Sequence, residues 1–436
     1  MPRTILFLLA ALLLTACEPQ STKPAYTARD LHQWNQVLLN TVMEDLFPPM
    51  IASRVYTYPQ IAAWLASAPP AQMRSYAETM LREFGTPPVA PDEPYDPTLA
   101  AFIAWTGVSS RLVFSEHHIQ ALKESRLTQA ESLSNDARRR SVAYGEAIAT
   151  YVLARAAKDA YAETRTYARW TPTQTDSTWW QTPPDYPNAL EPHWGKIHPL
   201  IVDSAQACAA PPPVAYSKNP ESPFYALAME TMSFSSGKNP STDAIAWYWD
   251  DNPNDYENVG HNTRFLHKYS PAGHWIHIAA SACKQNQTDF AQSAEIMAMM
   301  TMAQFDGFIV CWNDKYTTDR IRPISFIQAH IDPKWMSLIQ TPGFPEYPSG
   351  HSVISAASAE VLTHYFGEPF PFTDSTEYSF GLGVRTFNSF REAAREAGMS
   401  RLYGGIHFRD GVEEGLKQGE CIGRTVLNTL KETVTQ

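Results

Sequence analysis

The sequence predicts an all-α protein built from two bundle-like helical halves. Over long stretches apolar residues recur three and four positions apart, whereas few windows alternate polar and apolar residues as strands do. Hydrophobic residues make up 44% of the 436 positions, which is enough for a substantial core. We expect an N-terminal helical region at 28–222 and a C-terminal region at 223–436. The C-terminal region is expected to resemble a four-helix bundle and to carry the catalytic residues.

The first segment, residues 1–17, reads as a signal peptide rather than as part of the fold. Its apolar run at 5–14 follows Arg3 and is too short to span a bilayer. It ends in Leu-Thr-Ala-Cys, which resembles a bacterial lipobox, so we expect Cys17 to anchor the protein to a bacterial membrane through a tether at 18–27. A plain secretory signal and a short tail anchor are the alternatives. All three predict an exported protein that faces the periplasm or the cell exterior.

The remaining elements follow from the same helical spacing. It covers most of 28–165, and the chain from 171 to 213 is then so rich in proline and tryptophan that we predict a packed crossover without regular structure. The predicted C-terminal helices are 223–267, 276–282, 288–316, 349–366 and 410–434. In the last of them Gly415, Gly419 and Gly423 recur every four residues, which predicts close approach of a neighbouring backbone.

The charge balance and the cysteines limit the kind of partner. The chain has 34 basic and 45 acidic residues and a net charge of −11, which argues against nucleic acid or anionic lipid as the main partner. Any anion site must therefore be local. The cysteines that follow the signal segment can pair in an oxidising compartment, but the sequence leaves the pairing open. They are Cys208, Cys283, Cys311 and Cys421.

Three separate segments carry residues suited to chemistry. They are CWNDKYTTDRIRP at 311–323, EYPSGHS at 346–352 and SRLYGGIHFRD at 400–410. In the first, Lys315 and Arg322 are seven residues apart, about two helical turns, so a helix would present both on one face. Pro323 disfavours helical backbone at Arg322 and places this residue at the helix end. Taken alone, the pair is more typical of a solvated helix face.

The second segment places Ser349, Gly350 and His351 at the start of a predicted helix. The N–H groups of a first helical turn have no partners within the helix and can bind an anion, helped here by a serine hydroxyl and by close approach at glycine. An ordinary capping serine beside a chance histidine is the alternative. The third segment adds Arg401 and, six residues later, His407.

Together the three segments supply a pocket for a tetrahedral oxyanion. Lys315, Arg322 and Arg401 form a positive clamp, and arginine offers two-pronged hydrogen bonding to such oxygens. One neutral imidazole can attack phosphorus or coordinate a transition metal. The other can exchange protons with the apical oxygen.

These motifs resemble a known family. Lys-x6-Arg-Pro, Pro-Ser-Gly-His and Ser-Arg-x5-His, in this order, are similar to the signature of the superfamily that joins vanadium-dependent haloperoxidases with type-2 phosphatidic acid phosphatases. TPGFPEYPSGHSV and ASRVYTYPQIAAW resemble segments of the bacterial haloperoxidases, and the likeness extends over about 45–425. The resemblance implies an all-α enzyme that binds vanadate and uses hydrogen peroxide, a halide and a small organic acceptor.

The resemblance also assigns roles to residues. It implies that His407 binds vanadium, that His351 is the acid–base residue and that Lys315 polarises the peroxide. The vanadate oxygens would be held by Lys315, Arg322, Ser349, Gly350 and Arg401.

For three further positions the resemblance implies a role, and the residues alone leave an alternative open. Trp312 matches an aromatic residue on the halide side of the family's site, although a core tryptophan is equally consistent. Asp250 matches an acid that supports the clamp, although the adjacent Asp251 is also a candidate and a surface acidic turn is the alternative. The family often has an aspartate four residues after the metal-binding histidine, where this chain has Gly411. Asp410 or a backbone carbonyl is therefore expected to orient His407.

The competing function is an exported acid phosphatase in which His407 attacks phosphorus and His351 protonates the leaving alcohol. A third hypothesis is a non-catalytic lipoprotein that binds oxyanions. The presence of an acid–base histidine argues against it, because anion capture alone does not need one. The length and the helical N-terminal half favour the peroxidase. The sequence has no Gly-x-Ser-x-Gly elbow, haem-attachment motif, zinc-protease helix or Walker loop. His274 and His277 lie in an apolar helical context and are predicted to be core residues, with an approach of Gly-His-Trp at 273–275 to the pocket as the alternative.

Overall fold

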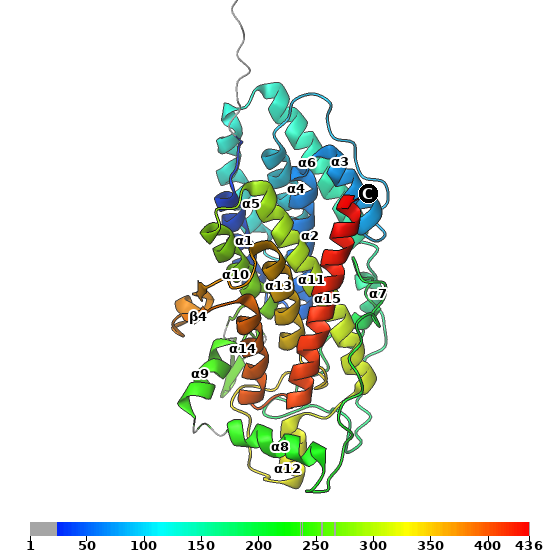
Figure 1. Cartoon of the computed structure of the whole chain (residues 1–436), viewed down its shortest axis with the longest axis vertical. Coiled ribbons are helices and arrows are strands. Elements are labelled where there is room, and N and C mark those ends of the chain that lie inside the picture. Colours follow the sequence, from blue (N-terminus) through cyan, green and yellow to red (C-terminus); the bar gives the residue numbers. More distant parts are fainter. Residues whose placement is uncertain (1–23, 236, 238, 254–255, 266, 436) are drawn as a thin grey trace, which may run out of the picture.

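The computed structural model describes residues 24–235, 237, 239–253, 256–265 and 267–435. The expected signal peptide, Cys17 and most of the tether lie outside these residues. Within the described part the protein is mostly helical, which confirms the predicted fold class (Figure 1).

The N-terminal part is helical, as predicted. Its elements are α1 (Ala28–Glu44), α2 (Pro49–Ser67), α3 (Pro70–Ser75), the π-helical turn η1 (Tyr76–Met80), α4 (Pro97–Leu112), α5 (Glu116–Leu127), η2 (Thr128–Ser132), α6 (Asn135–Ala156) and α7 (Tyr161–Thr164). Several begin with proline, whose fixed φ and missing N–H suit the first position of a helix. At α4 the cap is complete, because the Asp96 carboxylate accepts a hydrogen bond from the Leu99 N–H at 2.8 Å.

The segment 171–213, predicted as a packed crossover, has little regular structure in the described chain. Its one regular element in the described chain is the short 3₁₀ turn η3 (Trp194–Lys196). Trp179 and Trp194 are nevertheless fully buried, so the segment packs against the helices rather than lying in solvent. A disulfide between Cys208 and Cys421 ties this crossover to the last helix.

The C-terminal part differs from the prediction in four places. Its elements are α8 (Pro223–Phe234), α9 (Pro240–Tyr248), β1 (Tyr256–Val259), β2 (Asn262–Phe265), α10 (Pro271–Gln285), α11 (Phe290–Thr318), α12 (Pro323–His330), α13 (Gly350–Phe366), β3 (Phe372–Asp374), η4 (Thr376–Phe380), β4 (Arg385–Phe387), α14 (Phe390–Tyr403) and α15 (Arg409–Thr435). The predicted helix at 223–267 is two helices and an antiparallel hairpin that pairs Tyr256 with Phe265. Helices α12 and α14 and the short β3–β4 pair lie outside the predicted ranges.

Helix α11 is the centre of the molecule. It packs against α2 of the N-terminal part and against α13 and α15 of the C-terminal part, so one hydrophobic core joins the two parts (Figure 1). By length and composition α11 could cross a membrane, and among the described helices it alone meets that test. Its apolar stretch is almost entirely buried within the protein, as expected for a core helix.

The glycines of α15 allow close packing against α13, as the sequence predicts. A Cβ atom at Gly415 would lie 2.8 Å from the Ser349 carbonyl oxygen, and one at Gly419 would lie 2.2 Å from that of Val353. Both distances are shorter than van der Waals contact, so only glycine fits here. This packing fixes the N-terminal end of α13, where the predicted anion-binding residues lie.

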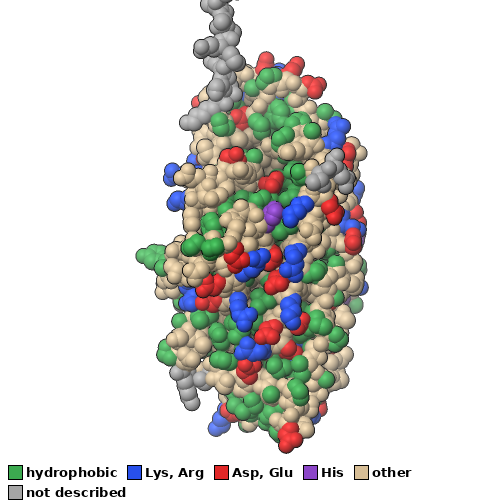
Figure 2. Space-filling model, viewed as in Figure 1, with side chains coloured by type: hydrophobic (Ala, Val, Ile, Leu, Met, Phe, Trp, Pro, Cys, Tyr) green, Lys and Arg blue, Asp and Glu red, His purple; other side chains and the backbone are tan. Residues whose placement is uncertain are grey.

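The exposed side of α14 and α15 carries charges of both signs. Figure 2 shows basic and acidic side chains interleaved over this face, without a large area of one sign. Several of these charges form ion pairs, such as Lys417 with Glu414 at 2.7 Å. Exposed pairs of this kind contribute about 0–1 kcal/mol each, so they keep the face soluble more than they stabilise the fold.

Candidate active site

The candidate site lies where the C-terminal end of α11, the N-terminal end of α13 and the α14–α15 loop meet. Five of the predicted residues line one cavity: Trp312, Gly350, His351, Arg401 and His407. The other four, Lys315, Arg322, Ser349 and Asp250, are buried directly behind its wall and contact the lining groups. The structure thus brings the nine predicted residues into one region.

Lys315 and Arg322 do not share a helix, contrary to the prediction. Helix α11 ends at Thr318, because Asp319 adopts left-handed backbone with φ of 46°. The chain then runs alongside the crossover, where the Ile321 N–H donates to the Ser177 carbonyl at 3.0 Å. Arg322 caps α12 directly before Pro323, as the proline predicts. Both cations point into the protein, and neither lies on a solvated face.

Lys315 is fully buried and holds the segment that leads into α13. Its ammonium group donates to three backbone carbonyls, those of Pro345 at 3.0 Å, Glu346 at 3.0 Å and Pro348 at 2.5 Å. Burial lowers its pKa to about 7. A nearby anion would favour the charged form, so the state of Lys315 depends on what the cavity holds.

Arg322 contributes a fixed and partly unsatisfied guanidinium. Nε donates to the Phe344 carbonyl at 2.8 Å, and Nη1 donates to the Ile406 carbonyl at 2.7 Å. Its Nη2 is buried and has no hydrogen-bond partner among the described residues. Burial lowers the pKa of Arg322 to about 9, which still leaves it charged at neutral pH. A buried donor without a partner is costly and marks a place for an acceptor.

His407 presents one ring nitrogen to the site. Nδ1 lies 2.8 Å from a carboxylate oxygen of Glu346, which accepts a hydrogen bond from the Nδ1–H. Nε2 therefore carries the lone pair, and it accepts a hydrogen bond from Arg322 Nη1 at 3.2 Å. Burial and the surrounding cations hold the pKa of His407 well below its usual range. The imidazole is neutral, as a nucleophile or a metal ligand must be.

The carboxylate that orients His407 is Glu346, so the expectation of Asp410 or a backbone carbonyl is wrong. The same oxygen of Glu346 also accepts from the Phe408 N–H at 3.1 Å. Arg320, which the sequence reasoning missed, bridges the second oxygen of Glu346 at 2.9 Å and Asp410 at 2.8 Å. Asp410 therefore supports the histidine indirectly. Glu346 stands in the EYPSGHS motif and could have been considered on that ground.

The start of α13 has the predicted form. Ser349 caps the helix, and its hydroxyl oxygen accepts from the Ser352 N–H at 3.4 Å. Gly350 is the first helical residue, and a Cβ atom there would come within 3.4 Å of the Trp312 ring. The Trp312 indole donates to the Leu190 carbonyl at 3.2 Å and packs against Phe344, so it forms the apolar wall of the cavity.

Asp250 lies beside Arg401, where the resemblance implied it. One carboxylate oxygen is 3.6 Å from Arg401 Nη2, and the other accepts from Lys268 Nζ at 2.5 Å. Arg401 Nη1 donates to the Trp249 carbonyl at 2.8 Å. The acid is buried rather than part of a surface turn, and it fixes the arginine at the cavity wall.

Behind His351 lies a chain of buried charges in which Asp374 is the member that the sequence did not suggest. His351 Nε2 is buried without a hydrogen bond to any described residue, 3.9 Å from a carboxylate oxygen of Asp251. The other oxygen of Asp251 is 2.9 Å from His274 Nδ1, and His274 Nε2 is 2.7 Å from Asp374. The two carboxylates raise the pKa of His274 well above its usual range despite burial.

His274 is thus a charged group close to the site and more than the core residue that was predicted. Its ring stacks on Trp249 at 4.5 Å between centroids. Burial, together with Arg401, His407, His274 and Lys315, holds the pKa of His351 well below its usual range. His351 is therefore neutral at neutral pH and able to accept a proton. His277 is largely buried, and its pKa is lowered to about 4, mainly by burial.

The arrangement defines a helical, oxyanion-binding enzyme site: buried cations and a helix start surround two neutral imidazoles. Residues 295–436 match the family model described as the VCPO second helical-bundle domain. A crystal structure described as the first bacterial vanadium-dependent iodoperoxidase is 36% identical, with a TM-score of 0.85 over 92% of this chain and 96% of that one. This chain therefore belongs to the vanadium-dependent haloperoxidase family.

Two more distant relatives are similar in fold or over part of the chain. The holo form of a bacterial vanadium-dependent chloroperoxidase shares the fold, with 18% identity and a TM-score of 0.68 over 90% of this chain and 94% of that one. The vanadium chloroperoxidase of Curvularia inaequalis is 25% identical over 175 residues. That match spans only 28% of the relative's length and 28% of this chain.

Proposed function

We propose that this protein oxidises a halide with hydrogen peroxide to hypohalous acid while vanadate is bound at His407. The overall reaction, H₂O₂ + X⁻ + H⁺ → HOX + H₂O, consumes one proton, so the site needs both an anion clamp and a proton-transfer group. The observation that carries the proposal is that two neutral imidazoles line one cavity. One is His407, whose Nε2 lone pair is made available by the Glu346 contact at Nδ1, and the other is His351.

The residues present fit a vanadate ion. His407 Nε2 would bind vanadium, and the unsatisfied Nη2 of Arg322 would donate to one of the vanadate oxygens. The Gly350 N–H at the start of α13, the Ser349 hydroxyl and the guanidinium of Arg401 would donate to the others. Bound vanadate supplies a Lewis acid that activates peroxide without changing its own oxidation state.

The chain's own groups then perform the remaining work. Neutral His351 accepts a proton from hydrogen peroxide at Nε2 and later returns it to the departing oxygen. Burial lowers the pKa of Lys315 to about 7, and a bound anion would favour its charged form, so that Lys315 would add positive charge at the site. Trp312 and Phe344 keep the halide side of the cavity apolar and limit the access of water.

Iodide is the halide that we propose first. The relative that covers nearly the whole chain at 36% identity is described as an iodoperoxidase. An apolar wall such as that of Trp312 also suits a large, weakly hydrated anion better than a small one.

The decisive experiment compares two activities of the same purified protein. Enzyme reconstituted with vanadate should iodinate an indicator phenol in the presence of hydrogen peroxide, with bromide and chloride tested in parallel. Turnover of p-nitrophenyl phosphate without oxidation of any halide would assign the chain to the phosphatase reaction instead. His407→Ala should lose vanadate binding, whereas His351→Ala should bind vanadate but lose at least about 100-fold in kcat.

We also propose export and lipid anchoring through Cys17. The lipobox-like sequence before this residue supports the proposal. Expression in bacteria with a radiolabelled fatty acid should label the wild-type chain in the membrane fraction, and Cys17→Ser should abolish the label.

A further inference from the structure

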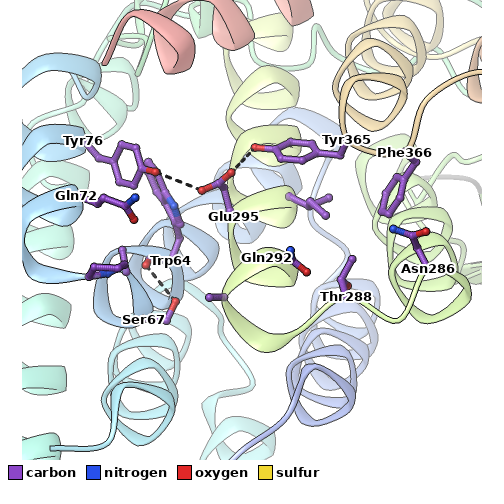
Figure 3. A pocket seen from close by; sticks show the side chains of 14 residues that line it. Trp64, Ser67, Gln72, Tyr76, Asn286, Thr288, Gln292, Glu295, Tyr365 and Phe366 are labelled. Atoms are coloured by element: carbon purple, nitrogen blue, oxygen red, sulfur yellow. Dashed lines mark hydrogen bonds between the residues drawn. The ribbon is translucent and has the colours of Figure 1, made fainter. Parts of the chain in front are cut away.

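A second cavity, of about 310 Å³, lies near the N-terminal end of α11, far from the candidate active site. Glu295 in its wall is 20 residues before Lys315 on the same helix, which corresponds to about 30 Å. The volume falls in the range of small-molecule sites. Figure 3 shows that its walls come from α2, η1, α11 and the end of α13.

The charged group in the wall of this cavity is the carboxylate of Glu295, which two tyrosines hold in place. The Tyr365 hydroxyl donates to one oxygen of Glu295 at 2.8 Å, and the Tyr76 hydroxyl donates to the other at 3.4 Å (Figure 3). Burial and the Glu295 charge raise the pKa of Tyr76 to about 12 and also raise that of Tyr365. Both tyrosines therefore stay protonated, act as donors and keep the carboxylate in one position.

Among the described residues that line the cavity, Glu295 is the one acidic residue, and none is a lysine or an arginine. Its neighbours in the cavity wall are aromatic, apolar or neutral polar residues. Burial and the charge of Lys431 lower the pKa of His364, next to Tyr365, below its usual value. The Glu295 carboxylate acts in the opposite direction but does not outweigh them. His364 is therefore mainly neutral at pH 7. The cavity keeps a net negative charge.

The helix ends around the cavity add to this negative charge. Helices α2, α10 and α13 end at its wall, where Ser67, Asn286 and Phe366 form part of the lining. The C-terminal end of a helix carries about half a unit of negative charge from its unpaired carbonyl groups. The start of α11 has the opposite sign, but the Asp289 carboxylate caps it by accepting from the Gln292 N–H at 2.8 Å.

Aromatic rings complete the site. Trp64 and Tyr76 pack together at 4.5 Å between centroids, and Tyr365 and Phe366 form the opposite side (Figure 3). Aromatic rings attract cations and also accommodate the apolar groups that an organic cation carries. We propose that this cavity binds a small organic ammonium ion, with its charge at Glu295 and its carbon groups against the rings. The site is separate from the proposed oxidation chemistry.

The test uses choline and its neutral isostere 3,3-dimethylbutan-1-ol, which differ chiefly in the charge of one central atom. Titration calorimetry with the whole chain should show saturable binding of choline and at least tenfold weaker binding of the alcohol. Equal binding of the two would show a merely apolar cavity and overturn the proposal. Failure of choline to bind at millimolar concentration would overturn it as well.

Variants locate the site. Glu295→Gln keeps an oxygen acceptor for a tyrosine but removes the charge, so choline binding should weaken at least tenfold while binding of the alcohol is unchanged. Glu124→Gln changes the net charge by the same amount on an exposed surface of α5 and should have no effect. Tyr365→Phe tests the site if Glu295→Gln fails to fold. It should weaken choline binding several-fold, and unchanged binding in both folded variants would overturn the proposal.

Discussion

Glu346 is the residue that decides which nitrogen of His407 is available. Its carboxylate accepts from His407 Nδ1 at 2.8 Å and from the Phe408 N–H, and Arg320 holds its other oxygen. Such partners fix the tautomer of a metal-binding histidine and raise its basicity. Replacing Glu346 by Gln should weaken vanadate binding about 10–100-fold, as measured by vanadate titration of the apoenzyme.

Asp410 provides the matched control for that prediction. It contacts Arg320 at 2.8 Å but does not contact His407 in the structure. Asp410→Asn should therefore change vanadate affinity much less than Glu346→Gln. An equal or larger loss in the Asp410 variant would contradict the assignment of Glu346 as the orienting acid.

Asp251 and His274 set the charge beside His351 without touching the reacting atoms. The cation at His274 lowers the pKa of His351, whereas the Asp251 anion, 3.9 Å from His351 Nε2, favours its protonation. His274→Gln should move the acid limb of the kcat/KM profile to higher pH, and Asp251→Asn should move it to lower pH. Shifts in the same direction, or none, would show that this network has only a structural role.

At the level of elements, the contact between α13 and α15 positions the N-terminal end of α13, where we propose that the anion binds. A Cβ atom at Gly419 would lie 2.2 Å from the Val353 carbonyl oxygen, and backbone cannot move as a side chain can. We expect Gly419→Ala to lower the free energy of unfolding by about 1–3 kcal/mol, although alanine favours a helix more than glycine does. Urea unfolding measures this loss.

Gly307 of α11 offers a matched substitution in a buried helix. Its nearest neighbours are the flexible end of Ile354 at 3.3 Å and a methyl group of Val353 at 3.5 Å. Gly307→Ala should therefore change the unfolding free energy by less than about 1 kcal/mol. A loss at Gly307 as large as that at Gly419 would mean that backbone crowding is not the cause.

The sequence predicted those elements whose signal is local. The cap at Ser349, the glycines of α15 and the tryptophan-rich crossover follow from short-range rules, and the structure contains all three. Helix α12, with eight residues, is too short for a clear apolar period, and α14 is rich in charged residues that hide its buried face. The two hairpins in the described chain are likewise shorter than a reliable alternation pattern.

The site residues that the sequence did not predict were missed for a different reason. Lys315, Arg322, Ser349, His351 and His407 belong to motifs with fixed spacing, so the resemblance could place them. Glu346 and Arg320 lie within the same segments, but the signature does not include them. The contact between His407 and Glu346 spans 61 positions and that between His274 and Asp374 spans 100. Tertiary packing alone creates such pairs, and one sequence contains no record of it.

At the scale of the whole molecule, buried neutral histidines tie stability to pH. His32 of α1 and His277 of α10 lie outside the candidate site, and burial lowers the pKa of each to about 4. An unfolded histidine titrates near 6.5, so between about pH 6.5 and 4 the unfolded chain binds more protons than the folded one. Stability must then fall as the pH falls through this window.

The network around His274 acts in the opposite sense and offsets part of this loss. Burial raises the pKa of Glu377 in this network to about 8, so the contribution of Glu377 to stability rises as the pH falls towards 5. The raised pKa of His274 gives a contribution that is fully present below pH 6.5 and disappears only as the pH rises through the folded value. The lowered pKa of Asp374, about 2, gives a contribution that is lost only below its unfolded value of about 4. Neither contribution weakens between pH 6.5 and 5.

Urea unfolding at pH 7 and pH 5 should therefore show that His32 and His277 lower the free energy of unfolding at pH 5, when the wild type is compared with a variant that lacks them. His32 and His277 should each account for up to about 2 kcal/mol of the difference, since one pKa unit corresponds to about 1.4 kcal/mol. The double variant His32→Gln/His277→Gln should show a clearly smaller difference, whereas His117→Gln on the surface should leave it unchanged. If the double variant kept the full pH dependence, the acid sensitivity would have to come from the site histidines, and added vanadate should then reduce it.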